Sequence, residues 1–394
     1  MTTPELTETE ATRYFALAQA ANITGDFQTA AQHAWKAQPI TYVESLGTYL
    51  WALNAIEEYQ QVSNIIDTVI PRLRDPNMLR EVLRLGRFAN CNLDDYGKAY
   101  AQAYTQLQGT KSFYPDVPMW DRQDISGKKL TVIAAMDGIG DHIMMSRFLP
   151  LIKQRGADIT LQAPASLHRL FSQFSCVSEI TDVAAYRPGD YQIQLSLLPH
   201  CLNVTAATIP QEPYIRAEPM SVEGEGVKIG LSWGASWMNQ YIDRTCALAE
   251  MHPITQVDGA SFYSLQKGGF AKQLNPPPVG MRITDLSEQL HDFADTASAI
   301  AALDAVVSTD NVVANLAGAM GKPVFLLADK PTEWRWGARG RVSWYPTARI
   351  YQQATRGVWQ EPINRLAENL REFVNGRFQE SNRGISPELT EGIQ

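Results

Sequence analysis

A carboxylate beside two glycines is the first group in this sequence that could do chemistry. Residues 130–136, LTVIAAM, predict a buried strand, and Gly138, Gly140 and Asp141 follow it before a helix-forming stretch. Glycines let another molecule approach the backbone, and a helix start offers unpaired N–H groups. Asp141 could take a proton from a substrate hydroxyl, or it could only cap the helix. We therefore consider Asp141 the candidate catalytic base, with Gly138, Gly140 and His142 as an acceptor or phosphate loop.

This glycine pattern departs from the common nucleotide-binding signatures. Ile143 occupies the third glycine position of G-x-G-x-x-G, and no acidic residue ends the next predicted strand, LQAP. The segment 318–323, GAMGKP, is too short for a P-loop and lacks its hydroxyl. These departures disfavour a nucleoside triphosphatase and weaken a nicotinamide or flavin enzyme, although an epimerase or a dehydrogenase stays open as an alternative.

Further candidates follow two strands in the C-terminal half. The run VKIGLSW ends at Gly234, and Arg244 comes shortly afterwards beside Asp243. The planar guanidinium suits a diphosphate, although a surface ion pair of Asp243 and Arg244 is the plainer interpretation. Gln266 and Lys267 end the next run, SFYSL. Because parallel strands share one carboxyl edge, Lys267 could reach the same site.

A third group of polar residues lies where the run AVVST meets a helix of small residues. Ser308, Asp310 and Asn311 stand at this turn, and Asn315 falls one helical turn later. The pattern predicts side chains and a helix N-terminus that face one sugar-donor site, or a simple helix cap. Trp336 could border the base or sugar, or pack in the core.

Short apolar runs alternate with helical stretches throughout residues 128–375. Alternating strands and helices predict parallel sheets with crossover helices. A polar stretch over 213–226 divides the series, so we expect two doubly wound, Rossmann-like halves. The predicted strand runs begin at residues 130, 157, 191, 227, 261, 304, 322 and 348.

Residues 1–115 have a helical pattern without strand alternation. The aromatic residues Phe27, Tyr59 and Tyr96 follow acidic residues and step by 32 and then 37 positions. These steps bracket the 34-residue period of tetratricopeptide repeats, and GDFQTAAQHAWKAQP resembles that family. A generic helical bundle is the alternative. Since stacked helix pairs build a surface for a macromolecule, we expect this part to choose the acceptor or a partner protein.

Composition limits the remaining possibilities. The 394 residues contain 34 Lys and Arg against 42 Asp and Glu, a formal net charge of −8. Such a chain has no general attraction to nucleic acid or anionic lipid. A polar, acidic start, the absence of a long apolar run and four scattered cysteines predict a cytoplasmic protein with buried thiols and no membrane insertion.

With these patterns in place, the sequence from about 130 to 350 resembles glycosyltransferase family nine, the lipopolysaccharide heptosyltransferase type, and proteins that join tetratricopeptide repeats to such a domain. Each motif is short, and it is their order and spacing that make the resemblance specific. The motifs that carry it are Gly138-x-Gly140-Asp141, Gly230-Leu231-x-Trp233, Ser264-Leu265-Gln266-Lys267-Gly268, Asp292-Phe293-Ala294-Asp295-Thr296, Ala301-Ala302-Leu303-Asp304, Ser308-x-Asp310, Leu316-Ala317-Gly318-Ala319-x-Gly321-Lys322-Pro323, Trp334-Arg335-Trp336 and Trp344-Tyr345-Pro346-Thr347.

The resemblance implies a GT-B fold of two facing domains and an inverting transfer from a nucleoside-diphosphate sugar, with no cofactor and no metal. Asp141 would be the base. A loop matching Ser308 to Asn311 would hold the donor sugar and its phosphates. Together with the candidates at the other strand ends, the predicted contacts of the sugar donor are Gly234, Arg244, Gln266, Lys267, Ser308, Asp310, Asn311, Asn315 and Trp336.

The chain departs from the family where Asn311 and Asn315 replace a threonine and a histidine, which leaves the identity of the sugar donor open. The acceptor is also open and could be a saccharide, a protein or a modified nucleobase. The alternative function is a non-catalytic scaffold with a degenerate transferase domain.

The predicted fold class is therefore helical repeats followed by a GT-B-type pair of parallel-sheet domains. The predicted boundaries are 1–115 for the helical domain, 116–127 for a linker, 128–212 for the first Rossmann-like domain on the acceptor side, 213–226 for an inter-domain linker, 227–375 for the second Rossmann-like domain on the nucleotide-sugar side, and 376–394 for a flexible tail.

Overall fold

The computed structural model describes residues 7–37, 42–108, 113–135, 137–235, 244–337 and 344–383. The chain divides into two compact units. Among the described residues, the first unit holds everything up to 212 together with 329–337 and 344–346. The second unit holds the rest. Residues 329–337 and 344–346, which the sequence places in the second Rossmann-like domain, therefore belong to the first unit, whereas residues from 347 on belong to the second.

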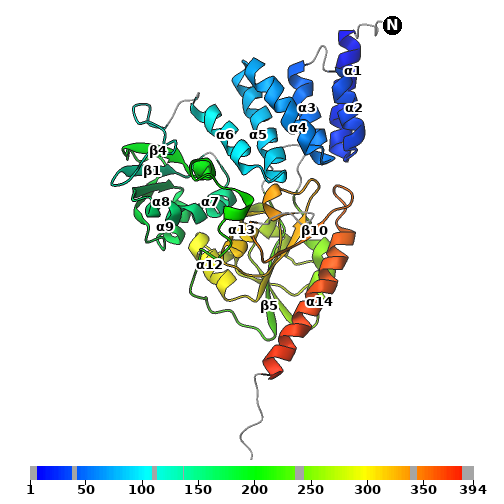
Figure 1. Ribbon diagram of the computed structural model, residues 1–394. Helices are drawn as coiled ribbons and strands as arrows, with labels where there is room; N and C mark the ends of the chain where they lie inside the picture. The colour runs from blue at the N-terminus through cyan, green and yellow to red at the C-terminus, as the bar shows by residue number, and fades with distance from the viewer. Residues whose placement is uncertain are drawn as a thin grey trace, which may run out of the picture. The chain divides into compact units, whose positions relative to one another are not determined.

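In the described part of the chain, six helices begin the first unit, and Figure 1 shows them side by side from blue to cyan. Consecutive helices pack on one another, α1 on α2, α2 on α3, α4 on α5 and α5 on α6. Their bounds are α1 (Glu8–Thr24), α2 (Phe27–Ala37), α3 (Tyr42–Ala55), α4 (Tyr59–Val69), α5 (Pro76–Asn92) and α6 (Tyr96–Gln108).

One turn geometry occurs three times among these helices. In each case a residue with positive φ follows the first helix, and the N–H of the next residue donates to the carbonyl five residues before it at 2.9 Å. This bond is typical of the left-handed helix cap. An aromatic residue then begins the second helix, which gives the pairs Gly25 and Phe27, Glu57 and Tyr59, and Asp94 and Tyr96. The internal repeat is therefore present, while its assignment to the tetratricopeptide family stays a prediction.

A four-stranded sheet follows in the same unit, with the order β3-β2-β1-β4 and all neighbours parallel. Its strands are β1 (Lys129–Ile133), β2 (Asp158–Ala163), β3 (Val177–Asp182) and β4 (Tyr191–Gln194), and its helices are α7 (Ile139–Met145), α8 (Leu149–Gln154), α9 (Ala165–Phe171) and α10 (Leu198–Cys201). Strand β3 has no predicted counterpart. It lies at the sheet edge with exposed polar residues, so it lacks the apolar run of a buried strand.

The predicted linker 116–127 is packed rather than extended through solvent. Trp120 and Ile125 are buried, because their apolar side chains lie against the first unit. Just before them, the Tyr114 hydroxyl donates to Gln162 Oε1 at 2.9 Å. The backbone N–H of Trp120 donates to the carbonyl of Gln192 in β4. These bonds attach the segment to the four-stranded sheet.

The second unit is built on a six-stranded parallel sheet with the order β10-β9-β8-β5-β6-β7. Strands β8 and β9 are buried along their whole length, as expected where helices cover both faces. The strands are β5 (Val227–Ser232), β6 (Ala260–Ser264), β7 (Thr284–Asp285), β8 (Ala305–Thr309), β9 (Val324–Ala328) and β10 (Ala348–Gln352), and the helices are α11 (His252–Thr255), α12 (Phe293–Ala301), α13 (Val312–Ala319) and α14 (Gln360–Arg383).

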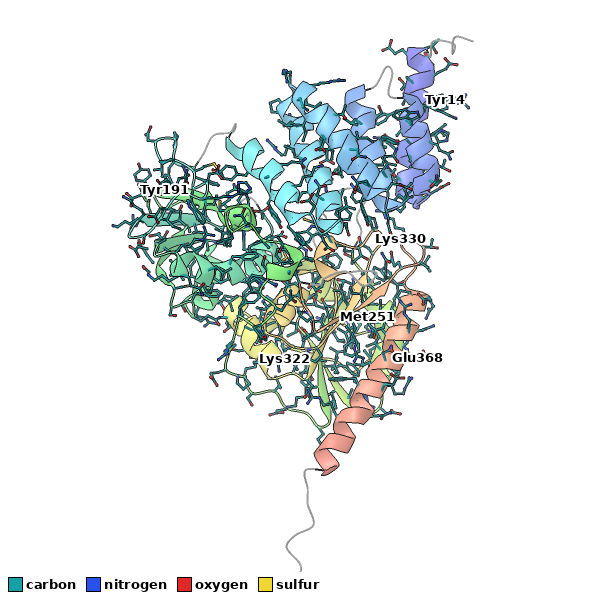
Figure 2. The ribbon with its side chains drawn as sticks, in the orientation of Figure 1. Tyr14, Tyr191, Met251, Lys322, Lys330 and Glu368 are labelled. Atoms are coloured by element: carbon teal, nitrogen blue, oxygen red, sulfur yellow. The ribbon has the colours of Figure 1, made fainter. Side chains whose placement is uncertain are left out.

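The core of this unit joins the sheet to α14, which packs against β5, β9 and β10 and is red in Figure 1. Met251, labelled in Figure 2, is fully buried in that core. Helix α14 runs to Arg383, so it continues past the predicted tail boundary at 376. The remainder of that tail, 384–394, lies outside the described residues.

The predicted inter-domain linker, 213–226, is attached to the second unit. The backbone N–H groups of Tyr214 and Met220 donate to the carbonyls of Ala319 and Ser298, at 3.0 Å and 3.1 Å. Ile215 between them is buried.

All four cysteines are unbridged. The thiols of Cys91, Cys201 and Cys246 are buried as predicted, whereas Cys176 is partly exposed.

Candidate functional site

Asp141 is the third residue of α7 and makes two bonds from its carboxylate. Its Oδ2 accepts the N–H of Gly138 at 3.1 Å, which caps the helix. Its Oδ1 lies 2.8 Å from Nη1 of Arg335. The Asp141 side chain is 25% exposed and that of Arg335 is 11% exposed. The residue therefore does cap α7, and it also faces a cation from a distant part of the chain.

Neighbouring charges determine the ionisation of Asp141. Burial alone would raise the pKa of this carboxyl, but the positive charges of Arg335 and Arg87 and the bond from Gly138 outweigh it. The net effect holds the pKa below its ordinary value of 3.8. At neutral pH the side chain is a carboxylate and can accept a proton.

The cations near Asp141 come from two segments that the sequence analysis did not assign to the site. Arg335 lies in the short 3₁₀ helix η8 (Trp334–Trp336), and Arg87 lies in α5 of the helical region. The resemblance includes Arg335 only as the middle of Trp334-Arg335-Trp336. No local signal identifies Arg87, because its proximity to Asp141 arises from tertiary packing.

The other residues of the first unit that were predicted to belong to the site occupy helix-start or core positions. Gly138 precedes α7 as its N-cap, and Gly140 is inside its first turn. His142 is buried, and burial lowers the pKa of its imidazole, so the ring is neutral at pH 7. Trp336 is buried and packs on Tyr345 with ring centroids 5.2 Å apart. Trp336 belongs to the first unit, whereas the other residues predicted to contact the sugar donor belong to the second.

Arg244 and Asp310 form a nearly buried ion pair in the second unit. Nη1 of Arg244 lies 2.6 Å from Oδ2 of Asp310, with side-chain exposures of 11% and 2%. The alternative partner, Asp243, lies outside the described residues. The pair brings two predicted residues together at the end of β8, and a fixed guanidinium is suited to a phosphate oxygen.

Asn311 joins the start of α13 to the end of β5. Its Oδ1 accepts N–H bonds from the first turn of α13, and its Nδ2 donates to the Ser232 hydroxyl at 2.9 Å. The Ser308 hydroxyl donates to Asn311 Oδ1 at 3.1 Å, and Asn315 Nδ2 donates to the Asn311 carbonyl at 2.8 Å. The amide at 311 therefore has a clear structural use, which a threonine could match only in part.

Gln266 fixes the backbone where β5 ends. Its Oε1 accepts bonds from the Ser232 hydroxyl and from the N–H groups of Trp233 and Gly234, at 2.8–3.1 Å. A Cβ at Gly234 would lie 2.4 Å from the ring of Phe270, so packing already requires glycine there.

Lys267 departs from the prediction that it reaches the same site. The residue is exposed, and its Nζ donates to the carbonyl of Ser287 at 2.6 Å. The bond to Ser287 holds the Lys267 ammonium group at the surface, although the neighbouring Gln266 side chain turns to the end of β5. The structure thus connects most of the predicted sugar-donor residues at the carboxyl ends of β5, β6 and β8, namely Gly234, Arg244, Gln266, Ser308, Asp310, Asn311 and Asn315.

Within the described ranges, no three His, Cys, Asp or Glu side chains are placed to hold a metal ion together. None of the helices described is both long enough and apolar enough to span a membrane.

Comparison with known proteins gives limited similarity. No family model matches the chain. The protein FlbA of Caulobacter vibrioides is 28% identical over 298 residues, which cover 65% of this chain and 48% of FlbA. The chain therefore spans about half the length of the curated relative that it matches.

Among solved structures, three similar chains are glycosyltransferases by name. ADP-heptose lipopolysaccharide heptosyltransferase II of E. coli has a TM-score of 0.47 and 16% identity, over 64% of this chain and 99% of that one. A family 9 glycosyl transferase of Veillonella parvula has a TM-score of 0.48 and 11% identity, over 64% and 100%. An O-GlcNAc transferase of Thermobaculum terrenum has a TM-score of 0.31 and 12% identity, over 96% and 94%. Likeness at this level identifies no activity.

Proposed function

We propose that the chain transfers a sugar from a nucleoside-diphosphate sugar to an acceptor hydroxyl. The observation that supports this most is the set of charged and amide side chains at the strand ends of the two sheets. An ionised carboxylate, Asp141, follows the first strand of one parallel sheet, and an arginine and amide network lies at the carboxyl ends of three strands of the other. Ligands of doubly wound sheets bind at such strand ends. The order of the sequence motifs, which resembles glycosyltransferase family nine, agrees with this proposal.

In the proposed reaction, Asp141 acts as general base. Its carboxylate takes the proton of the acceptor hydroxyl while the acceptor oxygen bonds to the anomeric carbon. The bond from that carbon to the diphosphate oxygen breaks, and the nucleoside diphosphate leaves with the bonding pair. Attack opposite to the leaving group inverts the anomeric configuration.

Arg244 and the start of α13 are the groups proposed to meet the diphosphate. Asp310 fixes the guanidinium of Arg244, whose planar fork suits phosphate oxygens. The first turn of α13 adds the partial positive charge of a helix N-terminus. We propose that these groups stabilise the leaving group without a metal. Asn311 and Gln266 would support this site by holding its backbone.

A non-catalytic sugar-nucleotide-binding protein is the second candidate. It is favoured by the internal bonding of the site, because the Asn311 and Gln266 amides bond within the chain and Asp141 already faces Arg335. In that case the fold would be kept for binding, with the helical region as a scaffold for a partner.

A panel of nucleoside-diphosphate sugars and nicotinamide cofactors, tested on the full chain, separates the candidates. A ligand at a hundred times its Kd adds about 2.7 kcal/mol to stability, which a thermal-shift assay detects readily. Chromatography of the same samples measures release of the nucleoside diphosphate, with EDTA in one arm. Release that survives EDTA supports the proposed transferase. A thermal shift without release supports the binding protein, and loss of release with EDTA contradicts the metal-independent mechanism. A response to nicotinamide cofactors alone would contradict both candidates.

A further inference from the structure

An aromatic cluster connects the third helical repeat, formed by α5 and α6, to the segment that carries Arg335. Tyr96, at the start of α6, has its ring centroid 6.2 Å from that of Trp334 and 5.7 Å from that of Trp344. The indole N–H of Trp344 donates to the Tyr96 hydroxyl at 3.3 Å. All three side chains are buried, so the contact is part of the interior of the first unit.

The same two tryptophans hold Arg335. The backbone N–H of Trp344 donates to the carbonyl of Arg335 at 2.9 Å, and the guanidinium lies 5.5 Å from the ring centroid of Trp334. Trp334 and Trp344 also contact each other, with centroids 5.1 Å apart. A continuous series of contacts therefore runs from Tyr96 through the tryptophans to Arg335 and ends at the Asp141 carboxylate, 2.8 Å away.

We propose that Arg335 is a positioning residue for Asp141, and that Tyr96 of the third helical repeat holds Arg335 in place through Trp334 and Trp344. The inference rests on the proposed function, because it assigns the residues that control its catalytic base. It also extends the role of the helical region. Beyond any choice of acceptor or partner, this region would shape the site of proton transfer.

Several charged and titratable groups interact with Asp141 or with its neighbours Arg87, Arg335 and His142, and they contribute to the sign of the pKa change. Arg335 and Arg87 each lower the pKa of Asp141, and in Arg335→Gln the contribution of Arg335 is lost while that of Arg87 stays. The pKa of Asp141 then rises, and the acidic limb of the kcat profile moves to higher pH. The groups concerned are Arg87 and Cys91 in α5, Tyr100 in α6, Asp137 and His142 beside Asp141, and Glu333 and Arg335 in or next to η8.

The repeat itself supplies a matched control for Tyr96. Tyr59 begins α4 in the second repeat, is also buried, and packs on Phe88 with centroids 6.2 Å apart. Tyr59→Leu and Tyr96→Leu remove the same ring from the same position of consecutive repeats. Only the second removes a ring that contacts Trp334 and Trp344.

The experiment records kcat against pH for the full chain and for Arg335→Gln, Tyr96→Leu and Tyr59→Leu. We expect the acidic limb to move to higher pH in Arg335→Gln and in Tyr96→Leu, and to stay in place in Tyr59→Leu. If Tyr96→Leu does not fold, Tyr96→Phe replaces it. That variant keeps the ring and loses the bond to Trp344, so it should shift the limb less and in the same direction.

The inference is overturned if the acidic limb of the kcat profile stays at the wild-type pH in Arg335→Gln and in the Tyr96 variants. If the limb moves as far in Tyr59→Leu as in Tyr96→Leu, the special role of Tyr96 is overturned. If the wild-type chain uses no sugar nucleotide, the proposed function fails separately. The carboxyl ¹³C resonance of Asp141, assigned with Asp141→Asn, then gives the pKa directly. A raised pKa in Arg335→Gln and Tyr96→Leu still supports the positioning of Asp141, and an unchanged pKa overturns it.

Discussion

Nη1 of Arg244 lies 2.6 Å from Oδ2 of Asp310, and this ion pair is almost completely buried. Removing one partner of a buried pair leaves the other charge uncompensated, which costs about 3–5 kcal/mol. We therefore expect Arg244→Gln and Asp310→Asn each to lower the free energy of unfolding by about that amount in urea titrations.

The double variant separates stability from binding. Arg244→Gln with Asp310→Asn removes both charges, so it should recover most of the lost stability. It should still fail to bind the nucleotide sugar, because the guanidinium is gone. Binding by the double variant at the wild-type affinity would assign the pair a purely structural role.

Asp141→Asn tests the proposed base. Asparagine can still accept the Gly138 N–H, so the helix cap is kept, but it cannot accept a proton from the acceptor. Loss of a general base reduces turnover by about a hundred- to ten-thousandfold. We expect a loss in that range in single-turnover transfer assays, with the thermal shift by the sugar donor unchanged. Wild-type turnover in this variant would mean that Asp141 only caps α7.

The stability of the chain should depend on pH through the same residue. The pKa of Asp141 in the folded chain is held below its ordinary value of 3.8. Its ionised form thus contributes stability that is fully present above the unfolded pKa and is lost as the pH falls through the folded pKa. The wild type should be more stable than Asp141→Asn at pH 7, and this difference should shrink below about pH 3.8. Urea unfolding between pH 7 and pH 3 measures it, and a difference independent of pH would contradict the assignment.

Gln266 and Lys267 are neighbours in the chain and should behave differently. Gln266→Ala leaves the buried N–H groups of Trp233 and Gly234 without their acceptor, and an unpaired buried donor costs about 1–3 kcal/mol. Lys267→Ala removes an exposed side chain and should change the free energy of unfolding by less than about 0.5 kcal/mol. The affinity for the sugar donor, measured by calorimetry, should fall in the first variant only. A fall in Lys267→Ala would restore Lys267 to the proposed site.

The sequence predicted where the strands end better than it predicted which charged side chains pair near those ends. Strands β1, β5 and β8 lie where apolar runs precede Gly138, Gly234 and Asp310, because a buried parallel strand and its turn leave a strong local pattern. Strand β3 has no such run and was missed.

The ion pairs were less accessible to prediction. Arg335 and Arg87 approach Asp141 only after the chain has folded. The sequence suggested its neighbour Asp243 as the alternative partner of Arg244, and nothing local indicated the ion pair with Asp310. Local patterns give the position of a charge along the chain, whereas its partner depends on tertiary packing.

The bond between Trp344 and Tyr96 joins residues 248 positions apart, and this separation has a consequence for biosynthesis. At about 5–20 residues per second, the ribosome needs roughly 12–50 seconds to advance from one residue to the other. During that interval the second unit's strands up to β9 are synthesised, while the nascent first unit still lacks the indoles that cover Tyr96. The first unit therefore cannot finish folding as an independent N-terminal domain, and a nascent chain stalled before residue 344 should expose α6 to proteases and chaperones.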